Sequence, residues 1–183
     1  KTASHCEAVL EHFPAEFLIE QSNIYSKLED NSFIAVMSQL FLNLARVKML
    51  CPDSTELLPD LLSCFCEMLK LDDDFVVNHI FQCMWIMAAK RENKTAIIES
   101  KILDLLTKNL FTKYKQYNGN NRRIDLSDRS RLLRLNIDQL QVLDMLKTAR
   151  DGIRTIELLS VNYDLCEDIA KMEYISSIIY CQQ

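Results

Sequence analysis

Apolar residues recur at intervals of three and four positions along almost the whole chain, which is the pattern of amphipathic helices. Pro14 separates the first helix from the second, because proline is tolerated at the start of a helix, and Ser22 or Asn23 is expected to restart the second run. The pattern predicts a first helix at about 4–13 and a second that begins at Pro14 and restarts at residue 22 or 23. Further helices are predicted at about 32–50, 55 or 59 to 71, 74–91, 94–117, 127–150 and 163–180, with a short helical segment that ends at 161.

Two stretches of this pattern carry more detailed expectations. The segment "SFIAVMSQLFLNLARVKML" (32–50) has apolar residues on nearly every side, so it predicts a buried helix. "CPDSTE" follows it as a break, in which Asp53 and Glu56 have the spacing of a capping box. The clearest loop is "NGNNRRIDLSD" (118–128), which is expected to be an insertion in a single helical domain that covers residues 1–183.

The composition narrows the fold class to all-α. Of 183 residues, 49% are hydrophobic and 26% are charged, the ordinary balance of a globular domain with a core. Gly119 and Gly152 are the only glycines. Because β-rich folds, dinucleotide-binding folds and phosphate-binding loops need glycine at tight turns, this scarcity excludes them.

The seven cysteines indicate a cytoplasmic protein with reduced thiols. They are odd in number and are spread through apolar runs, as expected of small core residues rather than of a disulfide framework. "NKT" (93–95) has the form of a glycosylation site but is interpreted as a helix junction. The chain shows no membrane-spanning run and no leader, and we expect it to be a fragment of a larger protein.

A repeat near 40 residues emerges when apolar and acidic turns are aligned. "FLIEQSNIYSKL", "AIIESKILDLL" and "CEDIAKMEYISSII" each place an isoleucine at the start of a second apolar turn, and "LLPDLLSCFCEML" is a looser copy. The aligned positions are Ile24, Leu62, Ile102 and Ile175, with spacings of 38, 40 and 73 residues. Such a period predicts a helical solenoid of about three to four repeats.

The segment "HIFQCMWIMAAKRENKTAIIESKILDLL" resembles the second and third helices of an armadillo repeat. It has a buried helix that ends in small residues, a polar turn with asparagine, and an "IIE" run; "LCEDIAKMEYISSII" is similar to the same third helix. The resemblance implies a right-handed armadillo-like or HEAT-like solenoid.

A second resemblance concerns the N-terminal stretch. "FPAEFLIEQSNI", within "HCEAVLEHFPAEFLIEQSNIYSKLED", resembles segments of the rotatin family of large armadillo-like proteins, which act as scaffolds at centrioles and basal bodies. It implies that the chain is part of a long solenoid that holds centriolar or centrosomal partners.

Paired carboxylates are the first candidates for chemistry. Glu16 and Glu20 lie one helical turn apart, but acid–base catalysis requires two carboxylates that flank a cleft, one of them with a pKa shifted by burial. The matching acids Glu99 and Asp168 recur with the repeat. A solvated or capping role is therefore favoured over a catalytic one.

Metal ligation and thiol catalysis are the other candidates. Cys64, Cys66, His79 and Cys83 are zinc-type ligands, but two residues apart on one helix means about 200° around its axis, so Cys64 and Cys66 cannot both reach one metal. The cysteines also occupy apolar positions rather than electropositive ones. We therefore predict no metal, no cofactor and no enzymatic activity.

A basic segment gives the main functional hypothesis. Residues 108–134 contain eight basic residues against Asp125 and Asp128, in a chain whose net charge is −5. Two interpretations of this segment stay open. The simpler one is a solvated insertion between repeats whose arginines pair with Asp125 and Asp128. The functional one is a site that binds an acidic or phosphorylated protein segment or nucleic acid through charge-assisted hydrogen bonds. The candidate binding residues are Lys113, Lys115, Arg122, Arg123, Arg129, Arg131 and Arg134.

These features predict a non-enzymatic scaffold for protein–protein interaction, with a nucleic-acid-binding helical module as the alternative. Phosphate binding weakens steeply with salt, whereas an apolar partner held in a groove does not dissociate in the same way. Apolar helix surface at the ends of the fragment, in "YISSIIY" or the N-terminal helices, is further expected to cause self-association.

Overall fold

The computed structural model describes residues 2–50, 56–71, 73–100 and 102–105, together with residues 108, 155 and 159. Throughout this part of the chain the secondary structure is helix and turn, in agreement with the all-α prediction. The elements are α1 (Thr2–His12), α2 (Ala15–Lys27), α3 (Asn31–Arg46), α4 (Leu58–Met68), the 3₁₀ turn η1 (Leu69–Leu71), α5 (Asp74–Ala88) and α6 (Asn93–Glu99). None of these helices is long and apolar enough to cross a membrane.

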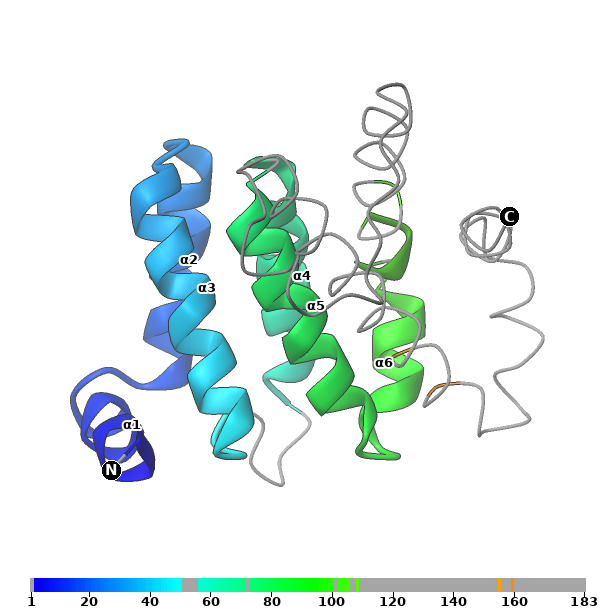
Figure 1. Ribbon diagram of the computed structural model, residues 1–183, viewed down its shortest axis with the longest axis horizontal. Coiled ribbons are helices and arrows are strands. Elements are labelled where there is room, and N and C mark those ends of the chain that lie inside the picture. The colour runs from blue at the N-terminus through cyan, green and yellow to red at the C-terminus, as the bar shows by residue number, and fades with distance from the viewer. Residues whose placement is uncertain are drawn as a thin grey trace, which may run out of the picture.

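The helices α2 to α5 form two layers. Helix α3 lies beside α5 and in contact with it, and α2 contacts α4 behind them (Figure 1). Helix α6 contacts both α4 and α5, whereas α1 crosses the end of the first pair and contacts α3. The helices of one layer therefore come from alternate positions in the chain.

The core lies between the two layers. Phe41 of α3 and Phe65 of α4 are fully buried and meet edge-on with ring centroids 5.5 Å apart. Edge-to-face aromatic pairs add to the stabilisation that burial alone provides. The other largest fully buried side chains are Ile34, Leu42, Leu44, Leu58, Leu61, Leu62, Met68, Ile80 and Met84.

Aspartate side chains fix the starts of two helices. Asp30 Oδ1 accepts from the backbone N–H of Phe33 at 3.0 Å, so α3 begins at Asn31. Asp73 Oδ1 accepts from the N–H groups of Phe75 and Val76 at the start of α5. Each cap satisfies donors that the helix itself leaves unpaired.

Helices α2 and α3 end in the same way, on a non-glycine residue with left-handed backbone. Glu29 has φ 57° and Lys48 has φ 62°. After Lys48, the N–H of Met49 donates to the carbonyl oxygen of Leu44 at 2.9 Å, and the equivalent bond after Glu29 joins Asp30 to Tyr25 at 3.2 Å. This bond is the mark of a Schellman motif, in which glycine is the preferred residue.

Three details of the expected helix boundaries are wrong. Helix α2 does not restart at Ser22, because this buried side chain donates its hydroxyl to the carbonyl oxygen of Leu18 at 2.8 Å and leaves the helix continuous. Helix α3 ends at Arg46 rather than near residue 50, and it is not buried all round, since Val36 is 68% exposed. The helix expected over 94–117 is interrupted at Ser100.

Other expectations are confirmed. Asn93 is buried at the start of α6, where Nδ2 donates to the carbonyl oxygen of Met87 at 3.0 Å, so "NKT" is a helix junction. Cys6, Cys64, Cys66 and Cys83 are free thiols, and all but Cys66 are buried. Asp53, the loop at 118–128 and the later helices lie outside the described residues, apart from the buried Thr155 and Leu159.

Truncation of the central aromatic contact should destabilise the whole stack. Phe65→Ala leaves a cavity beneath Phe41, and a loss of about 3–5 kcal/mol in the free energy of unfolding is expected. Urea denaturation followed by circular dichroism measures this loss. Val36→Ala is the control, because removal of an exposed side chain should change stability by less than about 0.5 kcal/mol.

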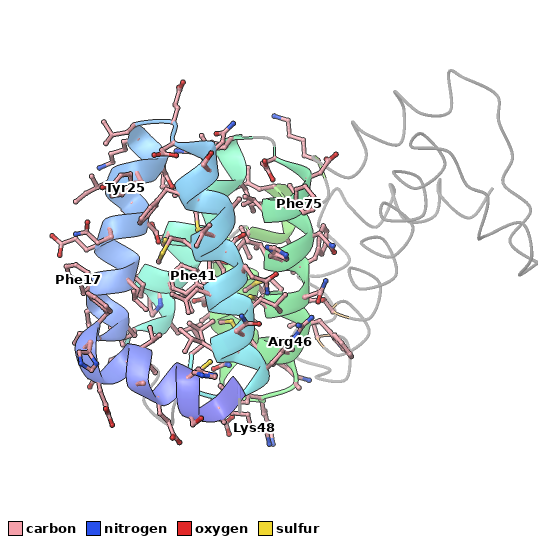
Figure 2. All side chains as sticks on the ribbon, turned by 60° about the vertical axis from the view of Figure 1, so that its left-hand side comes forward. Phe17, Tyr25, Phe41, Arg46, Lys48 and Phe75 are labelled. Atoms are coloured by element: carbon pink, nitrogen blue, oxygen red, sulfur yellow. The ribbon has the colours of Figure 1, made fainter. Side chains whose placement is uncertain are left out.

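The strained helix end gives a prediction of opposite sign. Lys48 is exposed after α3, as Figure 2 shows, and Lys48→Gly relieves the steric cost of a Cβ atom at positive φ. The variant should be more stable by roughly 0.5–1 kcal/mol in the same urea experiment. Lys27→Gly, at the last residue of α2, where the backbone is still α-helical, should instead be destabilising by a similar amount. Destabilisation by Lys48→Gly would contradict this account of the helix end.

Candidate functional site

The contact between α3 and α5 contains a buried polar pair. Ser38 Oγ lies 2.8 Å from His79 Nδ1, and the same hydroxyl donates to the carbonyl oxygen of Ala35 at 2.8 Å. Because a hydroxyl has one hydrogen to donate, His79 Nδ1 must carry a hydrogen and donate it to Ser38. This bond joins residues 41 positions apart and fixes the register of the two helices.

A second set of polar contacts continues along the same two helices toward solvent. The guanidinium of Arg46 donates to Gln82 Oε1 at 2.7 Å, which links α3 to α5. Within α5, Gln82 Nε2 donates to Asn78 Oδ1 at 3.2 Å. Within α3, Gln39 Nε2 donates to Asn43 Oδ1 at 3.2 Å. The side-chain amides of both helices are therefore held in fixed orientations.

The outward stripes of α3 and α5 follow one spacing. In both helices an exposed apolar residue is followed after three positions by a first amide, after four more by a second amide, and after three more by a large side chain. The two stripes are offset by 39 residues. We call them together the amide face, which consists of Val36, Gln39, Asn43 and Arg46 on α3 and Phe75, Asn78, Gln82 and Trp85 on α5.

The amide face is open to a ligand. Val36 and Phe75 are 68% and 69% exposed, and Figure 2 shows Phe75 and Arg46 toward opposite ends of the α3–α5 layer. Gln39 Oε1 and the Asn43 amide nitrogen keep hydrogen-bonding capacity that no contact among the described residues uses. Amides donate and accept at once, so a row of them suits the alternating N–H and C=O groups of an extended polypeptide.

Electrostatics at the centre of the face act on His79. Partial burial lowers the pKa of its imidazole below the ordinary 6.5, and the nearby positive charge of Arg46 lowers it further, against an opposing effect of Asp73. The imidazole is therefore neutral at physiological pH, with Nδ1–H directed at Ser38.

The basic residues predicted from sequence to bind a partner cannot be placed. Lys113, Lys115, Arg122, Arg123, Arg129, Arg131 and Arg134 all lie outside the described residues, and Lys108, at the edge of the basic segment, is exposed. The amide face was missed from the sequence alone. Its signal was the repeated spacing at an offset of 39 residues, close to the period of the apolar alignment.

The carboxylates considered for acid–base chemistry stand on a helix surface. Glu16 and Glu20 are both exposed on α2, and Glu99 is exposed at the end of α6. Asp168 lies outside the described residues.

Three of the four residues weighed as zinc ligands, Cys64, Cys66 and His79, have different neighbours. Cys64 Sγ is directed at the carbonyl oxygen of Ile19 in α2, 3.8 Å away, whereas Cys66 Sγ is directed at that of Ser100, 3.9 Å away after α6. His79 faces Ser38 instead. Within the described part of the chain, no three His, Cys, Asp or Glu side chains gather as a metal site.

Two of the described thiols, Cys64 and Cys66, are poor nucleophiles. Burial raises the pKa of Cys64 to about 12, although the neighbouring Ser22 hydroxyl acts to lower it. Burial and the charge of Glu67 also raise the pKa of the half-buried Cys66. Since the thiolate is the reactive form, neither group is activated at neutral pH.

No protein-family model, curated protein or solved structure matches the chain. What the protein does must therefore be inferred from its own residues.

The depressed pKa of His79 predicts a stability that depends on pH. The folded protein holds the imidazole proton less tightly than the unfolded chain, so the free energy of unfolding should fall as the pH drops through 6.5 and level off below the folded pKa. Well above pH 6.5 His79 is neutral in both the folded and the unfolded protein, so it does not change the free energy of unfolding with pH there. His79→Gln should remove this component and flatten the curve between about pH 7 and pH 5, measured by urea denaturation at each pH. Equal slopes for the two proteins would contradict the assignment.

Proposed function

We propose that the protein is a non-enzymatic scaffold that binds extended segments of other proteins along the amide face. The observation that carries this proposal is the pair of equally spaced stripes on α3 and α5, tied together by the bond from Arg46 to Gln82. Arginine and tryptophan, at the ends of the two stripes, are residues that often dominate binding energy at protein interfaces.

The arrangement of the helices supports a repeat architecture for this scaffold. The apolar alignment equated Ile24 on α2, Leu62 on α4 and Ile102, which is in the helical residues 102–105 beyond α6. Helix α4 contacts both α2 and α6. Leu62 and Ile102 are buried, whereas Ile24 is on the open side of the first pair. We infer an armadillo-like, right-handed solenoid, because such arrays stack similar helix pairs and expose one long face to extended partners.

The resemblance of "FPAEFLIEQSNI" to the rotatin family suggests a cellular location for this scaffold. We propose that the protein acts at the centrosome, centriole or basal body, and that its partners are components of those structures. The basic segment 108–134 is proposed as a second contact for acidic segments of the same partners.

Loss of the amides should weaken partner binding without unfolding the protein. Gln39→Ala with Asn43→Ala removes two hydrogen-bonding side chains and keeps good helix formers, so affinity should fall about tenfold or more. A pulldown from cell extract, with mass spectrometry of the retained proteins and titration of each hit, measures this loss. Ser63→Ala with Glu67→Ala on α4 is the control, because it has the same spacing outside the amide face.

A charge-reversal variant and a wash at high salt distinguish binding at the amide face from binding by the basic segment and from nucleic-acid binding. Changing Arg122, Arg123, Arg129 and Arg131 to Glu should weaken binding only if the basic segment contributes, and high salt should leave contacts to the amide face largely intact. Retention of mainly nuclease-sensitive material that is lost at high salt would support the nucleic-acid-binding alternative instead. Equal retention of every protein by the amide variant and its control would contradict the proposed site.

A further inference from the structure

An apolar stripe lies on the outer side of α2, away from the amide face. Four large side chains, between 41% and 67% exposed, follow one another along this helix and its two ends. The first two, Phe13 and Phe17, stack with ring centroids 5.7 Å apart. Figure 2 shows Phe17 on the side of α2 that points away from the other helices. The stripe consists of Phe13, Phe17, Ile24 and Leu28.

The opposite side of α2 is buried in the core, where it packs against α4. Ile19 and Ser22 are buried on the side where α2 contacts α4, and the thiol of Cys64 is directed at the carbonyl oxygen of Ile19. The stripe is therefore a separate surface, and exposed apolar side chains that share one side of a helix commonly mark a binding site.

The order of residues in the stripe is symmetric. Its midpoint falls between Glu20 and Gln21, with Phe17 and Ile24 at equal distances on either side. Phe13 and Leu28 are likewise equidistant from that midpoint. In an isologous interface residue i contacts residue j and j contacts i, so a twofold axis at this midpoint would pair Phe17 with the partner subunit's Ile24 and Phe13 with the partner subunit's Leu28. In an antiparallel pair of α2 helices each phenylalanine would meet an aliphatic side chain.

The polar residues of α2 fit the same arrangement. At the centre, the amide of Gln21 would donate to the carboxylate of the partner's Glu20, and the reverse bond would form across the axis. At the flanks, Glu16 would lie within about one helical turn of the partner's Lys27. The twofold axis makes two such pairs of opposite charge, one at each end of the interface. Among the described residues, none of these four side chains already has a hydrogen bond or ion pair.

We propose that two copies of this chain associate through α2 in an antiparallel, twofold dimer. A helix of this length spans about 20 Å, so the interface is at the small end for protein pairs, below about 1,200 Å². A dissociation constant in the micromolar range is expected. The dimer leaves both amide faces uncovered, and the proposal goes beyond the scaffold function without depending on it.

Sedimentation velocity of the full chain from about 1 to about 100 µM tests the association directly. The wild type should pass from monomer to dimer. Phe17→Ala with Ile24→Ala should weaken the dimer at least about tenfold, because each copy loses the two central apolar contacts. Val36→Ala with Phe75→Ala is the matched control, since it removes two even more exposed apolar side chains from α3 and α5, away from the stripe, and should leave the dimer unchanged.

A charge exchange tests the antiparallel orientation. Glu16→Lys or Lys27→Glu alone places like charges together at both flanks and should weaken the dimer about threefold to tenfold. The double variant restores opposite charges and should recover wild-type association. A monomer at every concentration, an open-ended oligomer, or a double variant no better than the single ones would overturn the proposal.

Discussion

The structure depends on the burial of apolar side chains between two layers of helices. Phe41 of α3 and Phe65 of α4 meet edge-on across this contact, and both are fully buried. Because each amphipathic helix must bury its apolar stripe against another element, α3 packs on α5 and α2 packs on both α3 and α4. The hydrogen bonds from His79 to Ser38 and from Arg46 to Gln82 then fix which residues of α3 and α5 lie next to each other.

Because apolar burial holds the helices together and polar contacts align α3 with α5, the sides of the helices outside the core remain available for binding. The amide face combines paired amides and arginine with the exposed apolar side chains of Val36 and Phe75, so it offers both hydrogen bonds and apolar contact to an extended partner. The stripe on α2 is different because four large apolar side chains dominate it, and covering them with another helix is favourable in water. Stacking thus leaves one mixed surface suited to an extended partner and one mainly apolar surface suited to a helix.

Much of the helical arrangement could be predicted from sequence, and the failures have local causes. The start of α5 at Asp74 and the junction at Asn93 followed from residue type and apolar spacing. The break expected at Ser22 failed because a buried serine can pair with a carbonyl of its own helix. Helix ends at Glu29 and Lys48 gave no signal, since glycine is absent from both positions.

The candidate site was less predictable than the fold. The pairing of Ser38 with His79 joins distant parts of the chain, and neither residue type nor spacing identifies its partner. The stripes of the amide face were visible in principle as one repeated spacing, but which side of each helix would stay exposed depends on packing. The basic segment stood out in the sequence because charge is a property of composition, whereas amides become a site only when the helices align them.

Native-state hydrogen exchange tests most directly whether the two stacked pairs form one unit that holds the amide face together. If they do, the slowest-exchanging backbone N–H groups of α3 and α5 should exchange through the same unfolding event, with one free energy of opening and one dependence of that free energy on urea concentration. A much lower free energy of opening for the backbone N–H groups of α5 than for those of α3 would contradict this account, because the two halves of the amide face would then unfold independently.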